Sequence, residues 1–129
     1  MQIDQKILCV DDEPNNLQVL RQILKDRYHL IFATSGEKAI EACIKHRPDM
    51  VLLDIMMPGM DGIEVCRSLK EDPETSDIRV VAMTGYYTPE VEKKVLAAGA
   101  QVLLKKPFSS EEVLRECGFQ EISEATIKG

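Results

Sequence analysis

Acidic, hydroxyl and basic side chains follow four short apolar runs of this sequence. Asp11 and Asp12 come after the first run and Asp54 ends the third, while Thr84 ends the fourth and Lys106 follows the fifth. Three carboxylates beside one ammonium group repel one another, since two like charges about 4 Å apart cost roughly 4 kcal/mol at an effective dielectric constant of about 20. A hard cation removes this repulsion. We therefore expect Mg²⁺ here, with Asp12 and Asp54 as direct ligands and Asp11 holding a metal-bound water.

These residue types also suit the transfer of a phosphoryl group. A carboxylate such as Asp54 can act as a nucleophile and form an aspartyl phosphate. Lys106 and the metal would neutralise charge on the phosphoryl oxygens, while the Thr84 hydroxyl and the Gly85 amide would donate hydrogen bonds to them. We predict phosphoryl chemistry at Asp54 that depends on positioning and charge, with no separate general acid or base.

The apolar runs before these residues alternate with stretches of helical periodicity. Continuous apolar runs indicate strands buried in a parallel sheet, and strict alternation with helices predicts a three-layer α/β sandwich with right-handed crossovers. Groups at the carboxyl ends of such strands meet at one edge of the sheet, where ligands bind. The expected strands are Lys6–Val10, His29–Ala33, Met50–Asp54, Val80–Met83 and Val102–Leu104.

Five helices are predicted from their start signals and from apolar residues at helical spacing. Proline favours the first turn of a helix, and a hydroxyl with an acid three residues later forms a capping box. The expected helices run from Pro14 to about Arg27, from the capping box of Thr34 and Glu37 to before Pro48, from about Gly62, from Pro89 after the N-cap Thr88 to Gly99, and from the capping box of Ser109 and Glu112.

Composition limits the classes of partner. A chain of 129 residues fits one domain with its own core. The net charge of −6 argues against direct binding of nucleic acid, which needs a basic surface. No apolar run is long enough to span a membrane and the N-terminus has no secretory signal, so we expect a cytoplasmic protein. The cysteines lack zinc-ligand spacing and are expected to be small core residues: Cys9, Cys43, Cys66 and Cys117.

Several of these motifs together resemble the receiver domain of two-component response regulators. The resemblance covers about residues 6 to 117, in the order and spacing of that family. It implies a flavodoxin-like (βα)5 sandwich with a five-stranded parallel sheet in the order 2-1-3-4-5. It also implies a receiver domain over residues 1–118, with residues 119–129 as the end of helix five or the start of a linker or tail. The motifs are Asp11-Asp12, the stretch from Leu53 to Gly62, Thr84-Gly85, Ala98-Gly99-Ala100 and Lys106-Pro107-Phe108.

The resemblance also implies a function. Receivers accept a phosphoryl group from a phosphohistidine on a sensor histidine kinase or phosphotransfer protein, then switch conformation and signal to an effector. They are signalling domains that catalyse only their own Mg²⁺-dependent phosphorylation and dephosphorylation. By position, Asp54 would be the phosphoacceptor. Asp12, Asp54 and the Met56 carbonyl would bind Mg²⁺, and Asp11 would act through water.

The remaining site residues follow from the same resemblance. Thr84 would be the switch hydroxyl, and Lys106 would bind the phosphoryl group and be joined to Pro107 by a cis peptide bond. The side chain of Met56, two residues beyond the acceptor, could shield the aspartyl phosphate from water, which predicts slow self-dephosphorylation.

The sequence departs from the family pattern at two places. Receivers usually carry an aromatic residue three positions before the lysine, where this chain has Leu103, and Tyr86 or Tyr87 is our candidate substitute. The predicted fifth helix is also shorter than usual. The sequence therefore does not decide whether the chain forms a homodimer through helix 4, strand 5 and helix 5. With few residues after position 117, we expect either a stand-alone receiver or the N-terminal part of a longer protein.

Two other functions use part of the same pattern. A phosphate-independent pseudo-receiver scaffold would keep the fold, but the intact acidic set and Lys106 argue against it. A phosphatase of the haloacid-dehalogenase type would also form an aspartyl phosphate. Such an enzyme needs a second acid two residues after its nucleophile, where this chain has Met56.

Overall fold

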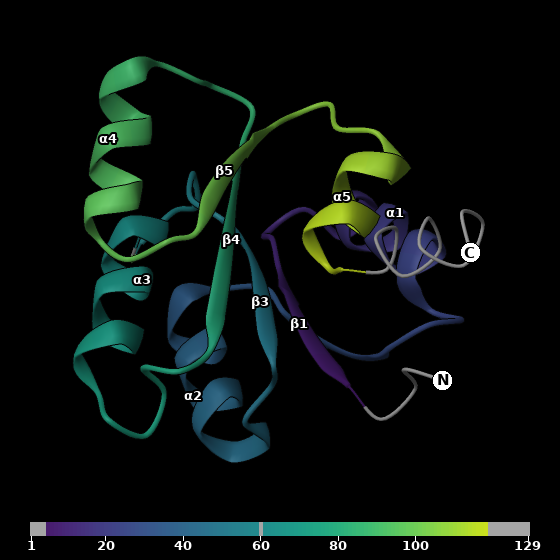
Figure 1. Cartoon of the computed structure of the whole chain (residues 1–129), viewed down its shortest axis with the longest axis horizontal. Coiled ribbons are helices and arrows are strands. Elements are labelled where there is room, and N and C mark those ends of the chain that lie inside the picture. The colour runs from purple at the N-terminus through teal and green to yellow at the C-terminus, as the bar shows by residue number, and fades with distance from the viewer. Residues whose placement is uncertain (1–4, 60, 119–129) are drawn as a thin grey trace, which may run out of the picture.

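The five apolar runs of the sequence form the strands of one parallel sheet (Figure 1). The structure is a computed structural model that describes residues 5–59 and 61–118. The strand order is β2-β1-β3-β4-β5, as expected for a flavodoxin-like fold. The strands are β1 (Lys6–Val10), β2 (His29–Ala33), β3 (Met50–Asp54), β4 (Arg79–Thr84) and β5 (Val102–Lys105).

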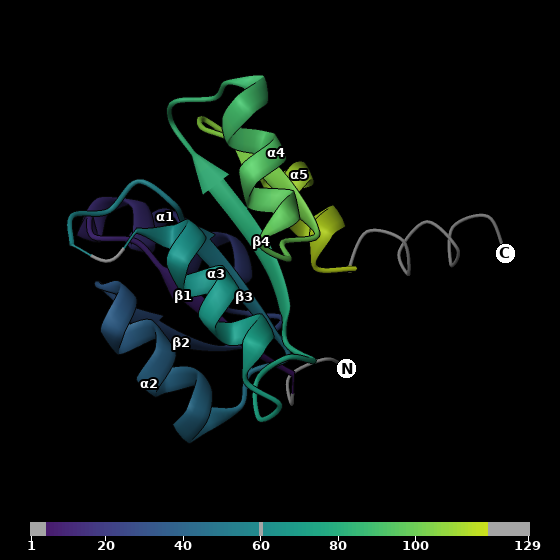
Figure 2. The same cartoon turned by 90° about the vertical axis from the view of Figure 1, so that its left-hand side faces the viewer.

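One helix follows each strand, which confirms the three-layer α/β architecture. Figure 2 shows α2, α3 and α4 on one side of the sheet, and α1 and α5 lie against the other. Side chains of successive strand residues point to opposite faces, so the strands contribute to two separate apolar clusters. The helices are α1 (Pro14–Leu24), α2 (Gly36–His46), α3 (Gly62–Glu71), α4 (Pro89–Ala97) and α5 (Ser110–Glu116).

The central strand is β3, and every one of its five residues is buried. Val51 and Leu53 face the cluster under α2, α3 and α4, while Met50 and Leu52 face the cluster under α1 and α5. A strand that is apolar on both faces is stable only when helices cover both faces. This burial fixes the position of Asp54, the last residue of the strand.

The helix starts agree with the predicted caps except at α2. Ser109 and Glu112 form the expected capping box, and the Thr88 side chain accepts a hydrogen bond from Val91 N. The predicted N-cap Thr34 is wrong, because Ser35 accepts the hydrogen bond from Lys38 N and α2 begins one residue later. Adjacent hydroxyl residues are chemically equivalent as caps, so the sequence pattern did not separate them.

The first helix ends earlier than predicted. It stops at Leu24 rather than near Arg27, and the amide of Tyr28 still donates to the Leu24 carbonyl at 3.1 Å. Tyr28 itself is buried, and its hydroxyl donates to the Cys117 carbonyl at 3.1 Å. The turn after Leu24 therefore directs a large aromatic side chain into the molecule instead of extending the helix.

Three of the four cysteines are core residues as predicted. Cys9, Cys43 and Cys66 are buried, whereas Cys117 is only half-buried because it caps the end of α5, and all four are free thiols. Within residues 5–59 and 61–118, the helices are all too short or too polar to cross a bilayer. The predicted linker or tail over residues 119–129 lies outside the described residues.

Candidate functional site

The acceptor candidate Asp54 is held by the turn that follows β3. Its side chain is almost fully buried, and Oδ1 accepts a hydrogen bond from the amide of Met56 at 3.0 Å. The turn closes where Gly62, at the start of α3, packs on Ile55: a Cβ built on Gly62 would lie 2.4 Å from the Ile55 Cα. The hydrogen bond from the Met56 amide and the packing of Gly62 on Ile55 therefore orient the Asp54 carboxylate.

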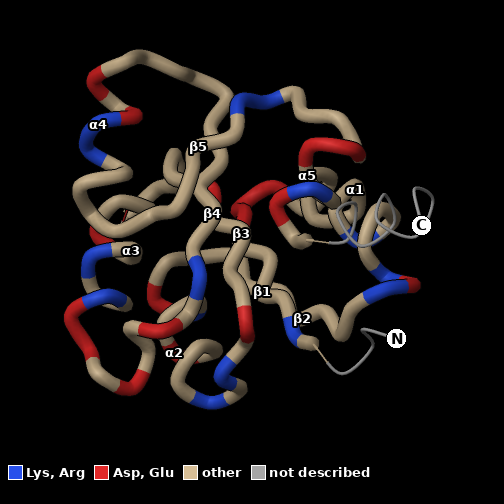
Figure 3. Tube along the Cα trace, viewed as in Figure 1, with Lys and Arg blue, Asp and Glu red and all other residues tan. Residues whose placement is uncertain are grey.

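The acidic turn after β1 contributes the other two carboxylates. Asp11 is fully buried, and its Oδ1 accepts a hydrogen bond from the amide of Glu13 at 2.9 Å. Asp12 is half-buried. Figure 3 shows the acidic run at this end of β1, next to the end of β3. One carboxylate oxygen from each of Asp11, Asp12 and Asp54 lies within 4.8 Å of the others.

Lys106 supplies the positive charge of the site. Its ammonium lies 2.9 Å from Asp11 Oδ2 and 3.3 Å from Asp54 Oδ2, so it bridges the ends of two strands. The backbone of Lys106 is fixed as well, because its amide donates to the Thr84 carbonyl at 2.7 Å. The Lys106–Pro107 peptide bond is cis, as the family resemblance implies.

Thr84 and Gly85 lie at the end of β4, on the same edge of the sheet. Thr84 is fully buried, and its hydroxyl oxygen accepts a hydrogen bond from the amide of Tyr86 at 3.0 Å. Nothing lies within 4 Å of a Cβ built on Gly85, so space remains beside its backbone. The structure thus brings all the predicted strand-end residues to one edge of the sheet.

Burial and charge act in opposite directions on the ionisable groups. Burial raises the pKa of Asp54, and the repulsion from Asp11 adds to this, while the hydrogen bond from the Met56 amide and the charge of Lys106 oppose it. Burial alone would lower the pKa of Lys106, but its bonds to Asp11 and Asp54 outweigh burial and raise the pKa. The site therefore holds more negative charge than its one lysine balances.

The donor set fits a magnesium ion. Three carboxylates close together, two of them buried, are a costly arrangement without a counter-charge. Mg²⁺ is usually bound by one or two carboxylates with water and phosphate oxygens completing the shell. Asp12 is half-buried at the edge of a groove of about 530 Å³ that also contacts Met56, so water and a phosphate group have access.

Met56 and Met57, which follow Asp54 in the turn, differ in their exposure to solvent. Met57 is buried, whereas 54% of Met56 is exposed. The outward position of Met56 follows from the turn, because its backbone amide points back to Asp54. Its side chain is therefore at the surface beside Asp54.

One cluster beside the site was missed from the sequence. The Tyr87 hydroxyl donates to Glu92 Oε1 at 2.6 Å, and the Lys105 ammonium lies 4.2 Å from the centre of the Tyr87 ring. This cluster joins the start of α4 to the end of β5. Leu103 is buried nearby among the residues under α4. An aromatic residue shortly after a strand end was the available signal, but its partners are distant in sequence.

Comparison with known proteins places the chain in a family. The model of the response regulator receiver domain matches residues 7–117. A probable cyclic di-GMP phosphodiesterase of Vibrio cholerae is 41% identical over 80% of this chain, and the match spans only 23% of that relative. Sporulation initiation phosphotransferase F of Bacillus subtilis is 37% identical over 86% of this chain and 89% of its own length.

Solved structures show the same likeness. The chemotaxis protein CheY4 of Vibrio cholerae superposes with a TM-score of 0.83 at 29% identity, covering 88% of this chain and 96% of that one. The receiver domain of sensor histidine kinase PA1611 from Pseudomonas aeruginosa, solved with a magnesium ion coordinated in its active site cleft, superposes with a TM-score of 0.79 at 28% identity, covering 86% and 92% of the two chains. From its sequence and its fold, this chain belongs to the response regulator receiver domain family.

Proposed function

We propose that this domain accepts a phosphoryl group on Asp54 from a phosphohistidine, in a Mg²⁺-dependent reaction, and then signals to an effector. The observation that carries the proposal is the position of the Lys106 ammonium, 2.9 Å from Asp11 and 3.3 Å from Asp54. A cation that bridges a buried acid and a strand-end acid can also contact a phosphoryl group attached to the latter. The names of the relatives, which include a phosphotransferase, support this reaction class.

Asp54 would react as its carboxylate. An oxygen of Asp54 forms a bond to phosphorus while the bond between phosphorus and the donor imidazole nitrogen breaks, and the imidazole keeps the electron pair of that bond. Because burial raises the pKa of Asp54, the charge of Lys106 and the Met56 amide are needed to keep the nucleophile ionised. Positioning and charge then supply the catalysis.

Asp12, Asp54 and the Met56 carbonyl would hold the magnesium ion, with Asp11 acting through a bound water. When bound, the ion neutralises charge on the phosphoryl oxygens. Asp11 also orients Lys106 through the ion pair between Oδ2 and the ammonium. Loss of Asp11 would therefore disturb both positive groups of the site.

The conformational switch would involve Thr84. Its hydroxyl oxygen now accepts from the Tyr86 amide, and a phosphoryl group on Asp54 would offer that hydroxyl and the Gly85 amide a stronger, charged acceptor. A shift at this end of β4 would be transmitted to α4, β5 and α5, the face where we place the effector contact and a possible homodimer. Since Leu103 is not aromatic, we assign the readout to Tyr87, which links α4 and β5.

Met56 would set the lifetime of the phosphorylated state. Its exposed side chain lies beside the acceptor, where it can cover the aspartyl phosphate and hinder the approach of water. We therefore propose that self-dephosphorylation is slow. A sensor histidine kinase or a phosphotransfer protein is the proposed phosphodonor, and the effector is a separate protein or another domain of a longer chain.

Intact-mass spectrometry tests the proposal. The 129-residue chain is exposed to a small acyl phosphate with Mg²⁺ or with EDTA, as wild type and as Asp54→Asn, and Asp77→Asn is the control because that aspartate is exposed and distant in sequence. We expect a stable gain of one phosphoryl group in wild type and Asp77→Asn with Mg²⁺, and none in Asp54→Asn. Labelling that turns over rapidly would favour a phosphatase, and no labelling at all would favour a phosphate-independent scaffold.

A further inference from the structure

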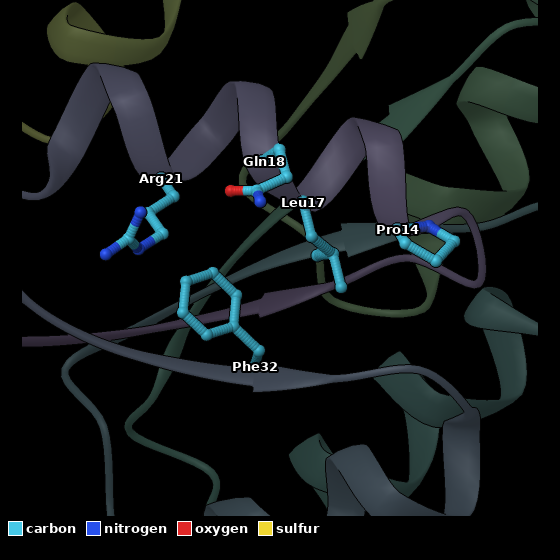
Figure 4. Close-up of a pocket in the computed structure, with 5 residues that line it drawn as sticks. All are labelled: Pro14, Leu17, Gln18, Arg21 and Phe32. Atoms are coloured by element: carbon cyan, nitrogen blue, oxygen red, sulfur yellow. The ribbon is translucent and has the colours of Figure 1, made fainter.

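A groove lies between α1 and the edge strand β2, on the face of the sheet that α1 and α5 cover. It has a volume of about 220 Å³, and its lining is mostly apolar. Figure 4 shows the Phe32 ring beneath α1, between the side chains of Leu17 and Arg21. Pro14 and Gln18 complete the lining. The groove is not part of the site around Asp54.

The groove exists because two helices do not cover the whole sheet. On the opposite face three helices, α2, α3 and α4, lie over the strands, whereas only α1 and α5 cover this one. Phe32 is in register with Cys9, whose side chain lies under α1, so Phe32 points to the same face at the uncovered margin. Consequently 40% of this aromatic residue is exposed.

The outer backbone of β2 is unpaired among the described residues, where β1 is its one neighbour in the sheet. His29 N donates to Gln5 O at 2.9 Å, and Ala33 O accepts from Asp11 N at 3.2 Å, so the odd-numbered residues bond toward β1. Because backbone groups alternate along a strand, those of Leu30 and Phe32 point to the open edge. No proline or charged side chain from Leu30 to Ala33 protects this edge from pairing with another strand.

Charge indicates which strand would pair there. Arg21 is the one charged residue in the lining, and Lys25 follows it directly after the end of α1. A second copy of the chain is disfavoured as the occupant, because each copy carries a net charge of −6 and pairing two β2 strands would place two Arg21 side chains over one shared face. An acidic partner is complementary to the groove.

We propose that the open edge of β2 binds an extended peptide segment of a partner protein, with an apolar residue against Leu17 and the Phe32 ring and an acidic residue two positions away against Arg21. Backbone hydrogen bonds to Leu30 and Phe32 would add the segment as a sixth strand. The spacing matches: Leu17 and Arg21 are separated by four helical residues, about 6 Å along the axis, and alternate residues of a strand are about 6.6 Å apart. The inference is independent of phosphorylation at Asp54.

A titration followed by amide nuclear magnetic resonance tests this. The probes are seven-residue peptides of threonine that carry Leu-Thr-Glu or Glu-Thr-Leu at their centre, since the direction of the added strand is open. Lys replaces Glu in the control peptides. We expect one Glu peptide to shift the amides of Leu30 and Phe32 and of α1 in a saturable manner, and the Lys peptides to bind at least about tenfold more weakly.

Variants of the chain test whether peptide binding is specific to this groove. Phe32→Ser should weaken binding by about tenfold or more, because truncation of an aromatic anchor commonly has that effect. Ile44→Ser is the matched control, because it removes an exposed apolar side chain from α2, outside the groove. It should leave binding unchanged. Arg21→Glu should reverse the preference, so that the Lys peptide binds better than the Glu peptide. Thermal unfolding of each variant checks that it is folded.

Three results would overturn the proposal. One is that no probe binds at millimolar concentration. Another is that binding is indifferent to the Arg21→Glu reversal. The third is that sedimentation shows self-association that Phe32→Ser abolishes while no peptide binds, which would make a second copy the occupant of the β2 edge.

Discussion

The two loops that flank Asp54 differ in how tightly they are packed. After β3, the turn is filled where it meets α3: Gly62 lies against Ile55, and the Met56 amide bonds to Asp54. After β4, nothing lies within 4 Å of a Cβ on Gly85, and 67% of Tyr86 is exposed. The first loop holds the Asp54 carboxylate in one position, whereas the second has room to change its position.

This difference suits a switch. A nucleophile must be positioned before the reaction, so movement of the acceptor would slow phosphoryl transfer. The segment that reports the reaction must instead have two arrangements of similar free energy, which requires free space and few packing contacts. The following substitutions are ordered from the largest expected effect to the smallest, and each one challenges this division.

Gly62→Ala should damage the filled side severely. The added Cβ would lie 2.4 Å from the Ile55 Cα and 2.9 Å from the Asp54 carbonyl oxygen, and backbone atoms cannot move aside as a flexible side chain can. We expect a loss of about 3 kcal/mol in the free energy of unfolding, the upper range for overpacking. Urea unfolding measures it. A loss close to zero would show that the turn after β3 is as adaptable as the one after β4.

Lys106→Ala should have the next largest effect, because Lys106 joins the two sides. Its ammonium contacts Asp54 on the β3 side, and its amide bonds to Thr84 on the β4 side. Removal of the side chain leaves the buried carboxylates of Asp11 and Asp54 without their counter-charge, which should cost about 2 kcal/mol in EDTA. Lys93→Ala, which removes an exposed lysine from α4, is the matched control. Equal stability of the two variants would contradict the bridging role.

Much of the fold was predictable because the apolar runs that form the inner strands β1, β3 and β4 are buried almost throughout. β3 shows this: its first four residues are apolar and face both helical layers, so only a central strand fits the pattern. The predictions that were wrong depended on a choice between adjacent residues of similar chemistry, such as Ser35 rather than Thr34 as the N-cap of α2. Contacts between distant segments, such as Arg79 with Glu116 at 3.0 Å, leave no local signal.

The site was predictable for a different reason. Parallel strands bring their carboxyl ends to one edge, so Asp11, Asp54, Thr84 and Lys106 had to converge once the strand order was right. The exposure of each side chain was not predictable, because it depends on how many helices cover each face. Phe32 is an example: it reads as an ordinary strand residue, and only the layer arrangement leaves it at an open margin.

Asp54→Asn should stabilise the chain by about 1 kcal/mol at neutral pH in EDTA, because it removes a charge that is costly to bury and that Asp11 also repels. Burial raises the pKa of Asp54 above its ordinary value of 3.8 in the folded state. The folded state then holds this proton more tightly than the unfolded state, so wild-type stability falls as the pH rises from 3.8 through the raised pKa. Asparagine cannot ionise and lacks this loss.

The difference between wild type and Asp54→Asn should therefore shrink as the pH is lowered toward 3.8. Urea unfolding of both proteins across this pH window measures it, with Asp77→Asn as the control for a general change of charge. If Asp54→Asn were less stable than wild type at neutral pH, the ion pair with Lys106 would outweigh burial, and the filled side would be stabilised by charge as well as by packing.

Gly85→Ala should have the smallest effect, within about 0.5 kcal/mol in the free energy of unfolding. The backbone at Gly85 does not lie in the left-handed region, and a methyl group there meets no atom within 4 Å. Alanine also restricts the unfolded chain, which offsets small losses in the folded state. The Gly85 amide, which we assign to phosphoryl binding, is retained.

Urea unfolding should thus separate two Gly→Ala changes beside the same site by about 3 kcal/mol. Similar losses in Gly62→Ala and Gly85→Ala would mean that the loop after β4 is as closely packed as the loop after β3, and would remove the space in which the switch is proposed to move.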